Sequence, residues 1–351
     1  MSVAKPKLHF LAVLPPPVTG MTVASRFMVD RFSATYTVGL YGPRKPRQLN
    51  GALWSLFKHA HLLLGAIRIS CTARRHDAVY FVLDSGYGAA GSILIAKILN
   101  LRNMHIIVHH HVFSYFNKPT TLSRTFFRAT QKATHIVLCR GMQRRLHANY
   151  GDRIPTEVLS NRNLIQAPES PPERDRLRAI GFLGNITQEK GIGTFLRTAT
   201  HLSQTCPGIK IHIAGPIADP AIAEAVRSFV ATDPERRRYH GAVYGMEKDK
   251  LLRAIDVLLF PTEYRNEAEP LTIYEALRYG SVVIANDLGC ISEQIGVDKF
   301  LVRTGDSFID IAAPLIEAAY QDPQVYQEQR SALAARLEPS QSSSRTQSGP
   351  T

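Results

Sequence analysis

The sequence predicts an α/β protein built from two doubly wound domains. Short apolar runs alternate with longer amphipathic stretches along the chain, which is the pattern of repeated strand–helix units. The proline- and charge-rich segment 166–176 interrupts this pattern and is typical of a linker. At 351 residues the chain has room for two domains of ordinary size.

In the first half, apolar runs short enough for buried strands lie between stretches with helical periodicity. The predicted strands are 8–14, 78–83, 106–109 and 136–138, and the predicted helices are 22–31, 53–69, 89–99, 123–132 and 142–149. Stretch 53–69 combines Trp54, Phe57 and three consecutive leucines with basic residues. It fits either a helix packed on its own sheet or an interfacial helix at a membrane.

The second half repeats the same alternation. The predicted strands are 179–183, 209–214, 257–260 and 282–285, and the predicted helices are 193–202, 221–230, 248–254 and 271–279. Ligands of doubly wound domains bind at the carboxyl ends of the strands, so we expect domains 1–165 and 177–336 to face each other across a cleft. The tail 337–351 is rich in Ser, Pro and Gln, and we expect it to be disordered.

The positive charge of the chain belongs to its first half. The formal net charge is +13, with 22 Lys and Arg against 5 Asp and Glu in residues 1–165, and 20 against 24 in residues 166–351. This imbalance favours an anionic partner such as membrane lipid, a phosphorylated substrate or nucleic acid, although solubility alone is an alternative. No apolar run reaches 18 residues, so no membrane-spanning helix is predicted.

Segment 266–287 is the most informative stretch for chemistry. Glu267 and Glu275 lie eight positions apart, and Pro270 precedes a short helical pattern that contains Glu275. The free N–H groups and the dipole at the start of a helix favour an anion such as phosphate, and a carboxylate accepts hydrogen bonds from a diol. The pattern therefore predicts a phosphate and polyol site, which are the groups that a sugar nucleotide presents.

Other common chemistries lack their motifs. The chain contains no Walker P-loop, no GxSxG elbow and no DxD motif. Three consecutive histidines, His109, His110 and His111, follow a predicted strand. Consecutive residues on an extended segment point in different directions, and no carboxylate or Cys set accompanies them, so we predict no metal site.

Four further stretches occur in an order that resembles family 4 of the retaining GT-B glycosyltransferases, in the branch that builds bacterial surface polysaccharides. They are LPPPVTGMTVASRFMVDRF (14–32), GFLGNITQEKGIGTFLRTA (181–199), IKIHIAGP (209–216) and HGAVYGMEKDKLLRAIDVLLFPTEYRNEAEP (240–270). Together with the Glu267–Glu275 spacing, the resemblance extends over about residues 8–320. It implies a GT-B fold of two Rossmann-like domains.

The resemblance also implies roles for the residues of the donor site. Glu275 would bind the ribose hydroxyls of the nucleotide, and Glu267 would face the hydroxyls of the transferred sugar. Main-chain N–H groups around Leu271 and Thr272 would meet the sugar or the diphosphate. Lys190 would neutralise the diphosphate leaving group, where negative charge develops.

Other positions are implied with smaller roles. Relatives carry a second diphosphate-binding arginine about five positions before the lysine, where this chain has Asn185, and Gly215 ends the central strand motif. Gly20, which we place in the loop after the first strand, would allow backbone to approach the phosphate or the acceptor. A histidine near the sugar and acceptor would be His111, or else His109, because side chains alternate on an extended segment.

Asp84 also ends a predicted strand and is expected to line the same cleft. The function implied is a metal-independent, retaining glycosyltransferase with no cofactor, which uses a UDP- or GDP-sugar donor and a glycan or lipid-linked acceptor. We expect a cytoplasmic protein bound peripherally to the inner face of the cytoplasmic membrane, with anionic lipid but no nucleic acid as a partner. The alternatives are a sugar-nucleotide epimerase-like enzyme on the same fold and a non-catalytic, basic anion-binding protein.

Overall fold

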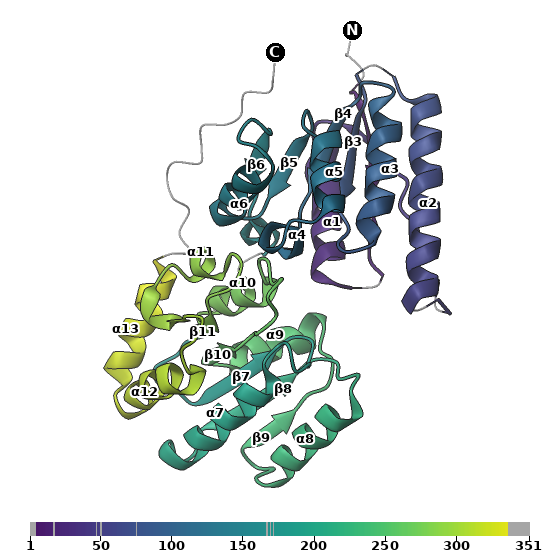
Figure 1. Ribbon diagram of the computed structural model, residues 1–351. Coiled ribbons are helices and arrows are strands. Elements are labelled where there is room, and N and C mark those ends of the chain that lie inside the picture. The colour runs from purple at the N-terminus through teal and green to yellow at the C-terminus, as the bar shows by residue number, and fades with distance from the viewer. Residues whose placement is uncertain are drawn as a thin grey trace. The chain divides into compact units, whose positions relative to one another are not determined.

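The structure is a computed structural model that describes residues 5–335, apart from residues 17, 47, 50, 75, 166, 167, 169 and 171. The chain divides into two compact units (Figure 1). The first unit comprises Met1–Leu164 together with Arg265–Glu269, and the second comprises the remaining residues. Both units are α/β, as the sequence predicts, and each contains a six-stranded parallel sheet.

The sheet of the first unit has the strand order β2-β1-β3-β4-β5-β6. Its strands are β1 Lys7–Leu11, β2 Thr37–Leu40, β3 Ala78–Val82, β4 His105–His109, β5 Thr134–Val137 and β6 Thr156–Val158. The strands β1, β3 and β4 are almost entirely buried, because helices cover both faces of a parallel sheet. The strand order reverses between β1 and β3.

The helices of the first unit fall into two layers. They are α1 Gly20–Ser33, α2 Gly51–Thr72, α3 Gly88–Asn100, α4 Ser114–Asn117, α5 Thr121–Ala129 and α6 Arg140–Tyr150, followed by the 3₁₀ turn η1 Asn161–Leu164. Helix α2 packs on α3, α3 on α5, and α5 on α6, so these four form one continuous layer (Figure 1). Right-handed crossovers place α1 on the opposite face, because the β1–β2 and β2–β3 connections run in opposite directions across the sheet.

The sheet of the second unit has the order β12-β11-β10-β7-β8-β9. Its strands are β7 Ala179–Leu183, β8 Lys210–Ala214, β9 Arg237–Tyr239, β10 Val257–Phe260, β11 Val282–Asn286 and β12 Leu301–Val302. The central strands β7 and β10 are buried at every residue, as continuous apolar runs in a parallel sheet should be. Here the order reverses between β7 and β10.

The helices of the second unit show clear sequence signals at their starts. They are α7 Ile192–Thr205, α8 Pro220–Ala231, α9 Gly245–Ala254, α10 Leu271–Arg278, α11 Ile291–Ile295, α12 Phe308–Gln321 and α13 Pro323–Ala334, with the 3₁₀ turn η2 Asp298–Phe300. Helices α8 and α13 each begin with an aspartate cap followed by proline. An aspartate at this position accepts hydrogen bonds from the first free N–H groups, and proline lacks the N–H that would be unpaired there.

The sequence prediction located all eight central strands but missed the four strands at the sheet edges. These are β2, β6, β9 and β12, which are two to four residues long. A strand this short gives too few alternations for a periodic signal. Helices α12, which packs on α7 and α13, and α13, which packs on β11, were also missed.

The predicted linker 166–176 lies partly outside the described residues, and the predicted tail 337–351 lies wholly outside them. The described end of the linker is fixed to the second unit. The Arg174 guanidinium is buried, pairs with Asp256, and donates to the carbonyl oxygens of Leu252 and Tyr279 at 2.9 and 3.2 Å. Among the described residues, no helix combines the length and apolar character needed to cross a bilayer.

Candidate functional site

In the second unit, the loops that follow β7 and β8 are in close contact at the point next to the strand-order reversal. Gly184 N donates to Ala214 O at 3.1 Å, and Gly215 has a φ of +143°. A Cβ at Gly215 would lie 1.7 Å from Gly184 O. Only glycine fits there, so the predicted site residue Gly215 acts by letting two backbones approach.

The loop that precedes α7 carries Lys190 and is held to the end of β10. Gly191 adopts a φ of +80°, and a Cβ there would lie 1.9 Å from Pro261 O. The half-buried Lys190 lies with its Nζ 5.1 Å from the centroid of the Tyr264 ring. Helix α7 has no side-chain cap, so its first N–H groups are available to an anion beside Lys190.

Asn185, at the position where the family resemblance implies an arginine, is exposed in the loop directly after Gly184. It lies at the carboxyl edge of the sheet, as the sequence predicts for a donor-site residue. Its amide can donate a hydrogen bond, but it brings no positive charge to the edge.

Helix α10 presents Glu275 and an uncapped helix start. Pro270 precedes the helix and provides no side-chain cap for the N–H groups of the first turn, which includes Leu271 and Thr272. Glu275 Oε1 accepts a hydrogen bond from Lys248 Nζ at 2.5 Å. Glu275 Oε2 is buried and has no hydrogen-bond partner among the described residues. An unsatisfied buried carboxylate oxygen is costly, and a ligand hydroxyl could satisfy this atom.

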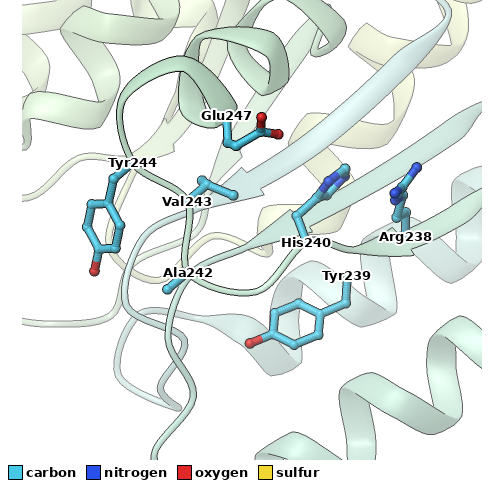
Figure 2. Close-up of a pocket in the computed structure, with 7 residues that line it drawn as sticks. All are labelled: Arg238, Tyr239, His240, Ala242, Val243, Tyr244 and Glu247. Atoms are coloured by element: carbon cyan, nitrogen blue, oxygen red, sulfur yellow. The ribbon is translucent and has the colours of Figure 1, made fainter.

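A cavity of about 470 Å³ lies at the carboxyl end of β9 (Figure 2). It is lined by Arg238, Tyr239, His240, Ala242, Val243, Tyr244 and Glu247. Tyr239 Oη donates to Gly215 O at 2.9 Å, which ties the cavity wall to the glycine contact. Glu247 directly precedes Lys248 in α9, so the same helix borders the cavity and provides the cation that pairs with Glu275.

His240, in the cavity wall, forms a hydrogen bond with His212 of β8, with 3.0 Å between Nε2 and Nδ1. Burial, together with a smaller contribution from the neighbouring His240, lowers the pKa of His212 to about 4. Burial also lowers the pKa of His240. Both imidazoles are therefore neutral at pH 7, and the cavity is bordered by polar but uncharged rings on this side.

In the first unit, the three histidines at the end of β4 alternate in direction as the sequence predicts. His110 points away from its neighbours and forms hydrogen bonds of 2.9 Å with Tyr115 and His135. His109 and His111 lie on the same side, with ring centroids 4.1 Å apart. Each has a buried Nε2 atom without a hydrogen-bond partner among the described residues.

The imidazoles of this pair are neutral. Burial lowers the pKa of His111 to about 4 and the pKa of His109 well below its usual value. Tyr80 Oη lies 2.7 Å from His109 Nδ1, and burial raises the pKa of Tyr80, so the phenol keeps its proton. The pair therefore offers neutral hydrogen-bonding groups rather than positive charge.

The loop that carries Glu267 belongs to the first unit, which the sequence did not predict. Asn117 Nδ2 donates to Arg265 O at 2.7 Å, and Phe113 N donates to Asn266 O at 3.3 Å. These donors come from the segment just after His111. The structure therefore groups Glu267, which is buried, with His111 and separates it from Glu275 by unit.

Glu269 fixes the other end of this loop, and the sequence analysis did not single it out. Its carboxylate accepts hydrogen bonds from Ser160 Oγ at 2.7 Å and from Asn161 N at 2.6 Å, and its carbonyl oxygen accepts one from Asn161 Nδ2 at 2.8 Å. Glu267 and Glu269 are both acidic residues of one short loop, so the sequence provides no signal that distinguishes their environments.

Two predicted positions differ from expectation. Gly20 is the first residue of α1 rather than a loop residue, and Thr19 and Thr22 form a capping box around it. Because threonine side chains satisfy this helix start, it is a less open site for an anion than the uncapped starts of α7 and α10.

Asp84 does lie at the end of β3, but cations from α2 already bind it. Its carboxylate lies 2.8 Å from Lys58 Nζ and 3.0 Å from His59 Nε2. Although burial raises the pKa of Asp84, the hydrogen bond from His59 and the charge of Lys58 bring it below its usual value. In the described part of the chain, no group of three or more His, Cys, Asp and Glu side chains is arranged to hold a metal ion.

Comparisons with known proteins agree with this geometry. Residues 178–320 match the family model of the glycosyl transferases group 1. No curated protein sequence matches the chain. Among solved structures, HepE from Anabaena in complex with UDP is 17% identical, covers 94% of each chain and has a TM-score of 0.69.

Two other solved structures have similar scores. Sucrose-phosphate synthase from Thermosynechococcus elongatus is 13% identical over 95% of this chain and 94% of its own, with a TM-score of 0.68. A trehalose-6-phosphate synthase described for glycosyl transfer with retention is 10% identical over 94% of each chain, with a TM-score of 0.64. Together these similarities show a GT-B fold of two Rossmann-like domains, with a region similar to the group 1 glycosyl transferases in the second unit.

Proposed function

We propose that this GT-B protein, whose second unit matches the group 1 glycosyl transferases, moves a sugar from a nucleotide-sugar donor to a glycan or lipid-linked acceptor. The transfer proceeds with retention at the anomeric carbon and without a metal ion, in the synthesis of bacterial surface polysaccharide or glycolipid. The acceptor hydroxyl attacks the anomeric carbon on the face from which the diphosphate departs. The bond between that carbon and the diphosphate oxygen breaks, and the diphosphate takes the hydroxyl proton.

The observation that carries this proposal is the environment of Glu275. One carboxylate oxygen pairs with Lys248, and the other is buried without a partner. A ribose diol donates two O–H bonds and satisfies a carboxylate in this state, whereas an anionic ligand group at the same atom would be repelled. Lys248 pairs with Glu275 and orients its carboxylate, and this role is not evident from the sequence.

The same unit contains positive groups that can stabilise the leaving diphosphate. Lys190 precedes α7, and the first turns of α7 and α10 provide uncapped N–H groups, including those of Leu271 and Thr272. Such donors stabilise charge as it develops on the departing phosphate, which is worth about 3–4 kcal/mol for one well-placed group. Asn185 contributes a neutral hydrogen bond, so Lys190 carries a larger share of this stabilisation than in relatives with arginine.

We assign the 470 Å³ cavity next to Lys248 to the base of the nucleotide. Its size suits a planar ring, and neutral His240 and the main chain from Ala242 to Tyr244 offer hydrogen bonds without charge. HepE is recorded in complexes with UDP and with UDP-glucose, which makes a uridine donor the first to test.

On the first unit, Glu267 and His111 are assigned to the transferred sugar and the acceptor. Both are held by short segments of well-defined hydrogen bonding, and the His111 imidazole is neutral at pH 7 because burial lowers its pKa. A neutral imidazole accepts or donates a hydrogen bond to a sugar hydroxyl without competing for the diphosphate. Gly20 is assigned to the acceptor side through its backbone.

A thermal-shift series with UDP-, GDP- and ADP-sugars tests the donor assignment, because a ligand of the folded state raises the melting temperature. We expect one base to give a clear shift, and Glu275→Gln to lose it. Glu328→Gln, a matched change at an exposed glutamate on α13, should keep the shift. A protein that is stabilised by none of these donors contradicts the proposal.

A product assay then separates transfer from the alternatives. Sugar should leave the donor at a rate that depends on an acceptor and is unaffected by EDTA. Conversion of the donor sugar in the absence of any acceptor would instead indicate the epimerase-like alternative. The anomeric configuration of the product, read by NMR, decides retention against inversion.

A further inference from the structure

Helix α2 carries a continuous apolar stripe on its exposed side. Leu53, Phe57, Ala60, Leu64, Ile67 and Cys71 are all exposed, and they follow one another at alternating spacings of four and three residues. At 100° per residue these positions lie along one line of the helix, about 27 Å long. Leu64 is 66% exposed and Leu56, beside the stripe, is 70% exposed, so this is a surface of large apolar side chains.

The stripe is not part of the core of the first unit. The buried residues of α2 are Leu62, Ala66 and Ile69, which lie on the opposite side of the helix. This buried side packs against α3 and β1 (Figure 1). One side of the helix therefore packs on its own domain, as one interpretation of stretch 53–69 predicts, and the other side is exposed.

The helical layer that contains α2 has no acidic residue. Helices α2, α3, α4, α5 and α6 contain no Asp or Glu, and the sequence has none between Asp84 and Asp152. The exposed cations of this layer include Arg68, Lys97, Arg124 and Arg128, and none of these four makes an ion pair with a described residue. A large part of the surplus positive charge of the first half is thus displayed beside the apolar stripe.

We propose that this layer of the first unit binds an anionic lipid bilayer, with the α2 stripe inserted among the headgroups and the cations of α2, α3 and α5 against lipid phosphates. A second copy of the chain is the competing occupant, since the spacing also fits a helix pair. Helix pairs of that kind place opposite charges beside the seam, but α2 offers only Lys58, Arg68 and histidines. Apolar residues flanked by cations without acids are instead the composition of interfacial helices.

This inference extends the proposed function, because it names the surface that a lipid-linked acceptor requires. It does not depend on catalysis, since binding to lipid is measured without donor or acceptor. Trp54, the one tryptophan of the chain, lies on α2 and reports insertion by its own fluorescence.

The full chain is mixed with vesicles of phosphatidylcholine alone, or of phosphatidylcholine with phosphatidylglycerol, and floated on a density gradient. We expect recovery with the anionic vesicles only, accompanied by a blue shift of Trp54 emission and quenching by brominated lipid. High salt should reduce the recovery, because the Debye length shortens. Equal recovery with both kinds of vesicle, or none with either, overturns the proposal.

Paired variants separate the two parts of the surface. Leu64→Gln with Ile67→Gln removes apolar groups that make no core contact, and should weaken vesicle binding about tenfold. Arg68→Glu with Lys97→Glu should weaken it at least as much. The matched control, Arg227→Glu with Lys299→Glu, makes the same change of charge in the second unit and should bind as the unchanged protein does.

Light scattering without lipid distinguishes a second copy from a membrane. A dimer that the Leu64→Gln and Ile67→Gln changes convert to a monomer, without any change in vesicle binding, would assign the stripe to self-association and overturn the lipid assignment. Transfer to a soluble acceptor should be equal in the stripe variants and the unchanged protein. A protein that does not bind lipid can therefore still have the proposed activity. A protein that lacks the activity can likewise still bind lipid.

Discussion

The carboxyl edges of the two sheets differ in chemistry although both sheets are six-stranded, parallel and doubly wound. The edge of the second unit combines close glycine contacts, uncapped helix starts, Lys190 and the Lys248–Glu275 pair. The edge of the first unit presents neutral His109 and His111. The loops rather than the sheets therefore decide that one edge suits a charged phosphate and the other suits neutral hydroxyls.

The largest effect should come from removing charge from the second edge. Lys190→Ala should lower kcat for sugar transfer by about 10²–10³, because charge on the departing diphosphate loses its cation. The change in KM for the donor should be smaller, since the charge develops in the transition state. Steady-state kinetics with the preferred donor measures this effect.

The matched control for this loss is Lys299→Ala, which removes a lysine at η2 of the same unit. It should leave kcat unchanged. An unchanged kcat in Lys190→Ala would contradict this comparison of the two sheet edges. The function of the second edge would then not depend on the positive charge of Lys190.

The neutral histidines of the first edge should make the first unit sensitive to acid. His111 and His135 have a pKa of about 4 when folded, and an unfolded histidine titrates near 6.5. Between pH 4 and pH 6.5 the unfolded chain binds more protons than the folded chain. The stabilisation from these buried, neutral histidines is therefore fully present above pH 6.5 and is lost as the pH falls toward 4. At pH 5 the loss is about 2 kcal/mol for each of these histidines.

Thermal unfolding followed by Trp54 fluorescence, which reports the first unit, measures this dependence between pH 5 and pH 7. His111→Gln should flatten it, whereas His76→Gln, at an exposed histidine of the same unit, should not. If the stability of His111→Gln depended on pH as steeply as that of the unchanged protein, the buried neutral His111 would not be a source of the acid sensitivity.

A smaller effect is expected from changes in the loop Arg265–Glu269, which lies in the second half of the sequence but belongs to the first unit. Glu269→Ala removes the acceptor of hydrogen bonds from Ser160 and Asn161, which frees the loop that carries Glu267. We expect kcat to fall about tenfold, because a loosely held group is misaligned for part of the time. The KM for the donor should change little, since donor-binding residues lie on the second unit.

Kinetics of Glu157→Ala provide the reference for this variant, since Glu157 is an exposed glutamate of β6 in the same unit. Ser160→Ala should give an intermediate loss, because it removes one of the donors to Glu269. If Glu269→Ala instead raised KM and left kcat intact, the loop would act in donor binding.

The smallest effect should come from adding a charge to the second edge. Asn185→Arg places a cation in the exposed loop after β7, at the position where the family resemblance implies one. We expect the affinity for the nucleoside diphosphate product to rise by a few-fold, in line with about 1 kcal/mol for a partly exposed charge pair. Isothermal titration measures this change, and Asn185→Gln is the neutral control.

The sequence by itself determined the class of the fold and gave the residues that we propose for the donor site. Buried runs such as 179–183 and 257–260 are long enough for apolar character to identify central strands of a parallel sheet. The glycines of the loops, and the helix that follows Pro270 and carries Glu275, can be identified from sequence alone. Each depends on a backbone or capping requirement of only a few neighbouring residues. The alternation of His109, His110 and His111 also follows from local geometry alone.

The tertiary structure decided what depends on partners distant in sequence. The edge strands β2, β6, β9 and β12 are too short to give a periodic signal, and only pairing with a neighbour makes them strands. Nothing near Glu275 in the sequence indicates that Lys248 binds it from another helix, or that Ser160 and Asn161 hold Glu269 from more than a hundred residues away. Which side of α2 packs and which side stays exposed is likewise fixed by the sheet beneath it, because both sides are apolar in sequence.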